Sequence, residues 1–291
     1  MKQVTANVYA EDQFSVPPKY RGCNPSFVTT SEGIVMIDTP MMPTDAIKWR
    51  KEIHKFGEVR YIINTDHHVD HTTGNFFFPG TVISHERTRE IFTAPAGQKI
   101  IKPGQRTLEY VRELIKKYDP EGASLLEKDY QPKAPTITFS DRLSLCVGEQ
   151  TFELIYLPGH TQCNIGIYML PDKVFFSGDN FTNKTQPSLA NSVPMEWVKA
   201  LRRIEALDID VVVPGHGEVS GKGEIQRFRL FIQQCIDMVR EAIKQGMSEE
   251  EAASKISFEE LYPGDQSNLA VHPGAEQQRR NVLQLYEMLS K

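Results

Sequence analysis

The residues best able to do chemistry are concentrated in one short stretch, NTDHHVDH, at positions 64–71. Three histidines and two aspartates fall within six positions there, from Asp66 to His71. Imidazole nitrogens and carboxylate oxygens are ligands that transition metals readily accept. Three further signals lie downstream: LPGHT at 157–161, SGD at 177–179 and PGHG at 214–217. Together they predict a metal site assembled from distant parts of the chain.

The stretches before these signals predict strands that would position them. Short apolar runs recur along the chain, namely GIVMID (33–38), VRYIIN (59–64), GTVISHE (80–86), TITF (136–139), LSLCV and TFELIYL (143–157), KVFFSGD (173–179) and DVVVPGHG (210–217). Helices predicted over about 44–56 and 195–207 alternate with these runs, which is typical of a layered α/β protein. Predicted strand ends at 38, 64, 158, 178 and 214 lie beside the polar residues. Loops at strand ends are where such proteins build sites.

The segment from about 86 to 135 interrupts this alternation. Apolar residues at helical spacing near 108–118 lie among Pro, Gly and Lys, which predicts a helical insertion. We interpret it as a lid with a partly apolar pocket wall, although a role in the core fits these side chains equally well: Phe92, Ile100, Ile101 and Tyr110. After Gly221 the pattern is mostly helical, giving a C-terminal extension over about 222–291 on a single predicted domain, 1–291.

Composition narrows the class of protein. Apolar residues make up 40% and charged residues 24% of the 291 positions, as in an ordinary globular protein, and the net charge is −5. The absence of a basic run argues against nucleic acid as a partner, so we expect a small-molecule substrate. The four cysteines form no CxxC pair, and neither a signal peptide nor a membrane-spanning run is visible. We expect a cytoplasmic protein, and a homo-oligomer is left open.

The set of signals resembles the metallo-β-lactamase superfamily. TDHHVDH (65–71) matches the family pattern H-x-H-x-D-H, and the other three signals follow in the family's order over roughly residues 20–220. The resemblance implies an α/β fold, a four-layer αββα sandwich with two divalent metal ions at the sheet edge. It assigns one ion to Asp66, His68 and His160, and the other to Asp70, His71 and His216. Asp179 would bridge both ions, and Asp38 would support the site from behind the ligands.

Asp66 departs from the family pattern, because it stands where the first histidine is expected. His67 falls at a variable position, and neighbouring side chains in extended backbone point in opposite directions. We therefore predict Asp66 as a ligand in preference to His67. A carboxylate adds negative charge and hardens the first site. Zinc is the expected metal, manganese and iron are the alternatives, and the occupancy of the first site is left open.

The chemistry of such a centre is hydrolysis. A metal-bound hydroxide would attack an ester, lactone, amide or related bond of a small molecule, while the cations stabilise the developing oxyanion. Asp70 is the predicted acid/base, because it would lie beside that hydroxide and can pass its proton to the leaving group. Two alternatives remain: an iron-dependent redox enzyme on the same fold, and a non-catalytic metal-binding or sensing protein.

Overall fold

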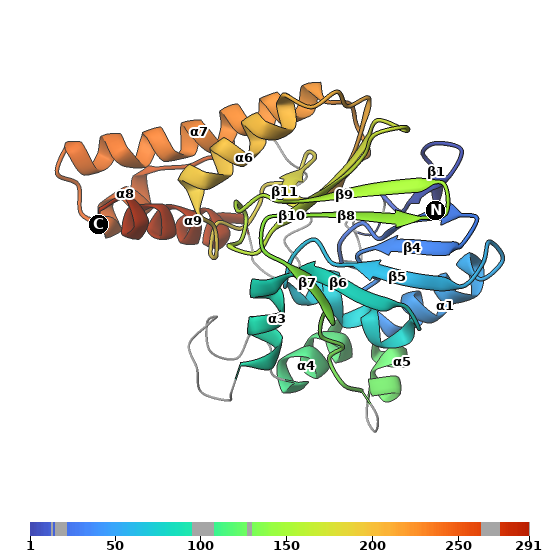
Figure 1. Ribbon diagram of the computed structural model, residues 1–291. Coiled ribbons are helices and arrows are strands. Elements are labelled where there is room, and N and C mark those ends of the chain that lie inside the picture. Colours follow the sequence, from blue (N-terminus) through green and yellow to red (C-terminus); the bar gives the residue numbers. More distant parts are fainter. Residues whose placement is uncertain (13, 15–21, 95–107, 127–129, 263–273, 291) are drawn as a thin grey trace.

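Two β-sheets lie face to face in the computed structural model, with helices outside each (Figure 1). The structure describes residues 1–12, 14, 22–94, 108–126, 130–262 and 274–290. Apolar side chains from both sheets interlock between them, and they include Val35, Ile63, Phe152 and Val213. The predicted four-layer αββα sandwich is confirmed. The predicted single domain spanning 1–291 stays a prediction.

The first sheet has seven strands in the order β1 to β7. Strands β1 to β4 pair antiparallel, and β4 to β7 pair parallel. Its strands are β1 (Lys2–Gln3), β2 (Val8–Ala10), β3 (Ser26–Thr30), β4 (Gly33–Ile37), β5 (Val59–Ile63), β6 (Thr81–His85) and β7 (Ile137–Phe139). The parallel half brings the ends of β4 and β5 to one edge, where the NTDHHVDH stretch begins.

Helices on the outer face of this sheet bury a second apolar cluster. The helical elements on this side are α1 (Pro43–Ile53), α2 (Val69–Thr72), η1 (Thr73–Phe77), α3 (Glu86–Thr93), α4 (Leu108–Tyr118), α5 (Pro120–Ala123) and η2 (Ser124–Leu126). Helix α4 places Val111 and Ile115 in this cluster beside Trp49 of α1. Helix α4, which lies within the predicted insertion, therefore belongs to the outer helical layer.

The second sheet has five strands in the order β12-β11-β10-β9-β8. Only β11 and β12 run parallel among its pairs. The strands are β8 (Arg142–Val147), β9 (Gln150–Tyr156), β10 (Ile165–Met169), β11 (Val174–Thr182) and β12 (Val211–His216). Its outer face packs on helices that bury the third apolar cluster, namely α6 (Pro194–Glu205), α7 (Gly223–Lys244), α8 (Glu249–Lys255) and α9 (Gly274–Leu289).

Three details differ from the sequence prediction. Strand β11 runs on to Thr182, so Asp179 lies inside it, at a shift in its pairing with β12. Strand β12 includes the histidine of PGHG. Strands β1, β2, β3 and β10 were not predicted. Of the proposed lid residues, Phe92 and Tyr110 are half-buried, whereas Ile100 and Ile101 lie outside the described residues.

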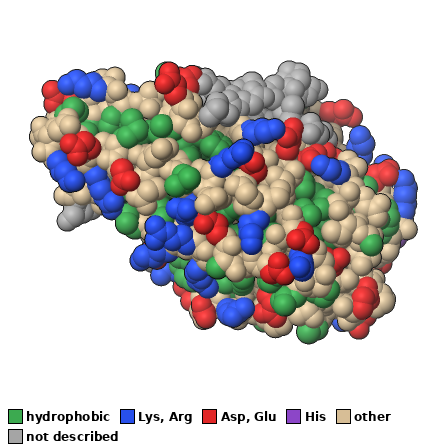
Figure 2. All heavy atoms as spheres, turned by 90° about the horizontal axis from the view of Figure 1, so that it is seen from above, with side chains coloured by type: hydrophobic (Ala, Val, Ile, Leu, Met, Phe, Trp, Pro, Cys, Tyr) green, Lys and Arg blue, Asp and Glu red, His purple; other side chains and the backbone are tan. Residues whose placement is uncertain are grey.

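The surface over the α6–α7 side carries mixed charge. Figure 2 shows Lys and Arg side chains lying among Asp and Glu side chains, without one sign covering this face. Among the described residues, no helix combines the length and apolar character needed to cross a membrane.

Candidate metal centre

The loop after β5 is held by buried side chains on both sides of the His/Asp stretch. Asn64 Nδ2 donates to the backbone oxygen of His71 at 3.1 Å and also bonds Asn75. Asp66 Oδ1 accepts from the backbone nitrogen of His68 at 2.8 Å, at the start of α2. With the stretch held in this way, four of its five His and Asp side chains belong to groups of candidate ligand atoms, Asp66, His68, Asp70 and His71.

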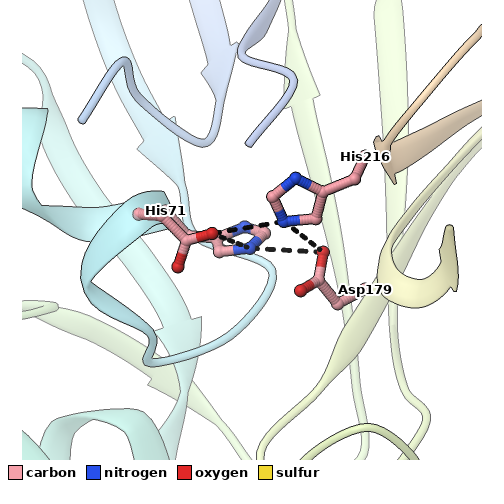
Figure 3. Close-up of side chains that lie close together, drawn as sticks. His71, Asp179 and His216 are labelled. Atoms are coloured by element: carbon pink, nitrogen blue, oxygen red, sulfur yellow. Dashed lines mark ion pairs between the residues drawn. The ribbon is translucent and has the colours of Figure 1, made fainter. Parts of the chain in front are cut away.

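The second set of candidate ligand atoms, which corresponds to the second of the two predicted metal sites, belongs to Asp70, His71, Asp179 and His216. Figure 3 labels three of these residues, His71, Asp179 and His216. His216 Nε2 lies 3.2 Å from Asp70 Oδ2 and 3.4 Å from Asp179 Oδ1. His71 Nε2 lies 3.7 Å from Asp70 Oδ2 and 3.3 Å from Asp179 Oδ1. Tetrahedral zinc with ~2.0–2.1 Å bonds holds its ligand atoms about 3.3 Å apart. The spacing therefore fits a small divalent cation.

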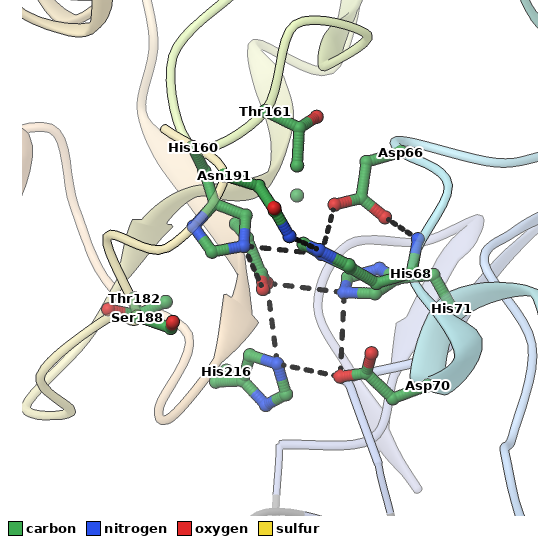
Figure 4. Close-up of polar contacts among 12 residues, drawn as sticks. Asp66, His68, Asp70, His71, His160, Thr161, Thr182, Ser188, Asn191 and His216 are labelled. Carbon is green, nitrogen blue, oxygen red and sulfur yellow. Dashed lines mark hydrogen bonds and ion pairs between the residues drawn. The ribbon is translucent and has the colours of Figure 1, made fainter. Parts of the chain in front are cut away.

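The first set, which corresponds to the first predicted metal site, joins Asp66, His68 and His160 (Figure 4). Asp66 Oδ2 lies 2.8 Å from His68 Nδ1, which lies 3.3 Å from His160 Nε2. His160 and Asp66 are buried, at 4% and 0% exposed, and His68 is half-buried. A carboxylate at position 66 thus reaches the same point as the two imidazoles.

Asp179 lies between the two sets. Its Oδ1 faces His71 and His216, while its Oδ2 lies 3.4 Å from His160 Nε2. The approach depends on Gly215, because a Cβ there would lie 2.0 Å from Asp179 Oδ1. One carboxylate thus offers one oxygen to each set, which is the arrangement that a bridging ligand requires.

The carboxylates of the centre are held ionised by the histidines around them. Burial acts to raise the pKa of Asp70, but His71 and His216 overcome it and bring that pKa to about 2. The pKa of Asp179 is likewise held well below its ordinary value, because His216 and His71 outweigh burial. Asp66 shows the same direction of pKa shift, with His68 the chief opponent of burial. Three buried negative charges converge here, and a bound cation would neutralise them.

The pKa values of two of the histidines, His216 and His160, are shifted in opposite directions. Burial acts to lower the pKa of His216, but Asp179 and Asp70 raise it to about 10. Burial prevails at His160 and lowers its pKa to about 4 despite Asp179. Among the described residues, three buried ligand atoms make ion-pair contacts only within the two sets and no well-oriented hydrogen bond: Asp66 Oδ2, His71 Nε2 and Asp179 Oδ1. Buried polar atoms are normally hydrogen-bonded, so these atoms point to a ligand between them.

Asp38 supports His71 from behind, where the sequence placed it. Its Oδ2 lies 2.8 Å from His71 Nδ1, and Thr65 donates to both carboxylate oxygens from its backbone nitrogen and hydroxyl. Asp38 has a φ of 54°, which is uncommon outside glycine and marks a constrained position. With a proton on Nδ1, the lone pair of His71 Nε2 is directed into the centre.

His67 belongs to neither set, although its ring lies 4.5 Å, centroid to centroid, from that of His68. Its Nδ1 lies 3.0 Å from Cys163 Sγ in a buried contact, and Thr161 Oγ1 lies 3.4 Å from the same sulfur. Two other histidines that were not predicted as ligands also lie outside both sets. His54 is exposed beside Glu58, and His85 caps the N-terminus of α3. His272 lies outside the described residues.

Several supporting residues were missed by the sequence reasoning. Asn180 accepts from the backbone nitrogen of His160 at 3.0 Å, and the ring of Trp197 lies against His160 with centroids 5.5 Å apart. Trp197 Nε1 also donates to the backbone oxygen of Asn180. Asn191 contacts His68 from a loop that carries no motif. Asn180 was recognisable only as the neighbour of Asp179, and Trp197 only as the apolar face of a helix.

The fold and these two sets of ligand atoms define a protein of the metal-binding αββα class. The model of the metallo-beta-lactamase superfamily matches residues 19–216, and the chain belongs to that superfamily. Members typically bind divalent metals, and they include hydrolases.

Two curated relatives are similar to this chain in sequence. It is 26% identical over 192 residues to the 2,4-dinitroanisole O-demethylase subunit alpha of Nocardioides sp. (strain JS1661), covering 63% of this chain and 49% of the relative. It is 21% identical over 298 residues to the linear primary-alkylsulfatase of Pseudomonas sp. (strain ATCC 19151), covering 89% and 54%. The chain therefore spans about half the length of these relatives.

Solved structures show the same fold. A metallo-beta-lactamase family protein from Thermus thermophilus superposes with a TM-score of 0.67 at 17% identity, covering 99% of this chain and 94% of that one. The sec-alkylsulfatase Pisa1 from Pseudomonas sp. also gives a TM-score of 0.67, at 14% identity, covering 98% of this chain and 49% of that one.

Proposed function

We propose that this protein is a metal-dependent hydrolase with two divalent cations, zinc by preference, acting on an ester, lactone, amide or related bond of a small molecule. The observation that carries the proposal is Asp179, whose two oxygens face two separate sets of candidate ligand atoms. One cation is assigned to Asp66, His68 and His160, and the other to Asp70, His71 and His216, with Asp179 shared.

The chain's own residues have distinct tasks in this proposal. Bound cations supply the chemistry of lowering the pKa of a coordinated water and polarising the bond under attack. Asp70 is ionised and 13% exposed at its side chain, so it can take up a proton and return it to the leaving group. Asp38 keeps His71 oriented, because its carboxylate holds the ring at Nδ1.

The charge of the metal centre and the two curated relatives suggest the classes of substrate to test. Asp66 adds a carboxylate to the centre, which makes the site less positive than one with histidine there and favours a neutral carboxylic ester or lactone. Two relatives are named as an O-demethylase subunit and an alkylsulfatase, so an aryl methyl ether and an alkyl sulfate belong among the candidate substrates.

The test is turnover by the full chain, stripped with a chelator and reloaded with zinc, manganese or iron. The panel contains a carboxylic ester, a lactone, an amide, a primary alkyl sulfate and 2,4-dinitroanisole. We expect turnover that requires the metal and is lost in Asp70→Asn. Asp141→Asn, which changes an exposed carboxylate on the same domain, should keep full activity.

The outcomes separate the alternatives. Metal-dependent release of acid or alcohol by a colourless zinc protein supports hydrolysis. Iron with visible absorption bands, and oxygen consumption without hydrolysis, would replace the proposal by the redox alternative. Two bound cations with no turnover of any panel member would favour a binding or sensing protein.

A further inference from the structure

His68 presents its two ring nitrogens to different partners. Nδ1 faces Asp66 and His160 within the candidate ligand set. Nε2 lies 3.2 Å from the side-chain amide nitrogen of Asn191, and Figure 4 shows Asn191 next to His68. Asn191 lies between β11 and α6, outside the motifs that carry the family pattern.

The chemistry of this contact changes with the tautomer of the ring. When Nδ1 carries the proton, that proton faces the carboxylate of Asp66, and Nε2 accepts from the Asn191 amide nitrogen. When Nδ1 gives its lone pair to a cation, Nε2 must carry the proton and needs an acceptor. The carbonyl oxygen of Asn191 supplies one after a half-turn of the amide group. Asn191 can therefore pair with His68 in both forms.

Hydrogen bonds from a C-terminal helix hold the loop that carries Asn191. Asn281 of α9 is 3% exposed. Its Oδ1 accepts from the backbone nitrogen of Leu189 at 2.9 Å, and its Nδ2 donates to the backbone oxygen of Pro187 at 3.0 Å. Both contacts lie within a few residues of Asn191. A buried amide that bonds in both directions fixes the loop at this point.

A second fastening lies nearer the start of the loop. Gln186 Nε2 donates to the backbone oxygens of Phe258 and Tyr262, both at 3.0 Å. The hydroxyl of Tyr262 donates to the backbone oxygen of Thr182, the last residue of β11. These contacts come from chain beyond residue 216, where the match to the family model ends.

We propose that Asn191 is a positioning residue for the first cation, and that the C-terminal helices hold it against His68 through Asn281. The proposal rests on the metal centre of the proposed function. In this proposal the C-terminal extension contributes to the metal site. Without the hydrogen bonds from Asn281, the loop that carries Asn191 moves away, and the ring of His68 loses the partner that stabilises its metal-binding tautomer.

The experiment measures stepwise zinc binding to the metal-free full chain, in competition with a chromophoric chelator. Asn191→Leu has a similar size but no acceptor, and it should weaken the first-site affinity about 10-fold or more, as the loss of a group that orients a ligand does. Asn191→Asp keeps an acceptor and should retain that affinity. The second-site affinity should stay unchanged in both.

The C-terminal link has its own variants. Asn281→Ala should weaken first-site binding in the same direction as Asn191→Leu, whereas Glu287→Ala, on the exposed face of α9, should behave as wild type. Gln186→Ala tests the same link should Asn281→Ala fail to fold. Nitrogen NMR of the zinc-loaded protein should show His68 with its proton on Nε2, hydrogen-bonded in wild type and without that bond in Asn191→Leu.

Three results would overturn the inference. Equal first-site affinities for wild type and Asn191→Leu would remove the role of Asn191. An equal fall in Asn191→Leu and Asn191→Asp would assign the effect to packing. Wild-type first-site affinity in both Asn281→Ala and Gln186→Ala would show that the C-terminal helices do not position Asn191. The inference requires that the wild-type protein binds two ions. If the wild-type protein never fills the first site, the proposed function is overturned as well.

Discussion

Replacing Asp66 tests the departure from the family pattern directly. Asp66→Asn keeps an oxygen that can accept from the backbone nitrogen of His68, but it removes the charge that faces His68 Nδ1 at 2.8 Å. Asp66→Ala removes both. The first set then falls from four ligand atoms to three, namely His68 Nδ1, His160 Nε2 and Asp179 Oδ2.

The magnitude follows from this loss. Even groups that only orient a ligand cost roughly 10–100-fold in metal affinity when they are removed. Loss of a ligand should cost at least as much, which is about 1.4–2.7 kcal/mol at the first site. The second set keeps all its atoms, so its affinity should change little. Asp66→His should restore two tight sites and increase the preference for zinc.

Calorimetric titration of the metal-free protein with zinc distinguishes the two steps. His67→Ala is the matched control, because His67 is the neighbouring residue and directs its Nδ1 to Cys163, while its ring lies beside His68 without being part of either ligand set. We expect two binding steps in His67→Ala and one weakened step in Asp66→Ala. The reasoning is refuted if His67→Ala loses a step while Asp66→Ala keeps both.

Three further outcomes are expected. Asp179→Ala should fold but lose most of both cations, because one carboxylate faces both sets; near-normal metal content by elemental analysis would contradict the bridging assignment. The pKa of His216 is about 10, so zinc must displace its proton at neutral pH, and affinity should rise as pH increases towards 10. Calorimetry in buffers of different ionisation enthalpy should detect that proton, and its absence would refute the linkage. Trp197→Phe leaves the buried backbone oxygen of Asn180 without its indole donor and should cost about 1–3 kcal/mol in urea unfolding, whereas an unchanged midpoint would refute this.

The polar residues at strand ends were predictable because both periodicity and position are local properties of the chain. VRYIIN is a short apolar run, and β5 forms there, with the His/Asp stretch directly after it. The structure brings together all seven residues named as candidate ligands, Asp66, His68, Asp70, His71, His160, Asp179 and His216. Their spacing in sequence could not give the 3.2–3.7 Å separations that His71 and His216 keep from Asp70 and Asp179, which depend on how the two sheets meet.

Other features depend on distant contacts that leave no local pattern. β1 is only two residues long and exposed, so it has no apolar signal. The amphipathic pattern of α4 was visible, but a lid and a layer of the core present the same pattern, and only the burial of Val111 and Ile115 distinguishes them. Asn191 and Asn281 are ordinary asparagines in sequence, because their roles come from a loop and a helix that meet across about 90 residues.

The charge of the centre connects its geometry to the class of chemistry. Asp66, Asp70 and Asp179 are buried or nearly so, and the histidines hold all three carboxylates in their ionised form. Burying such a group of negative charges is unfavourable in free energy, and bound cations would offset that cost. The same residues that form the ligand sets therefore also favour metal binding electrostatically. Two divalent cations would more than neutralise three carboxylates, but by less than in a site with histidine at position 66. The attraction for anionic substrates is then weaker, which is the physical reason for placing neutral esters and lactones first.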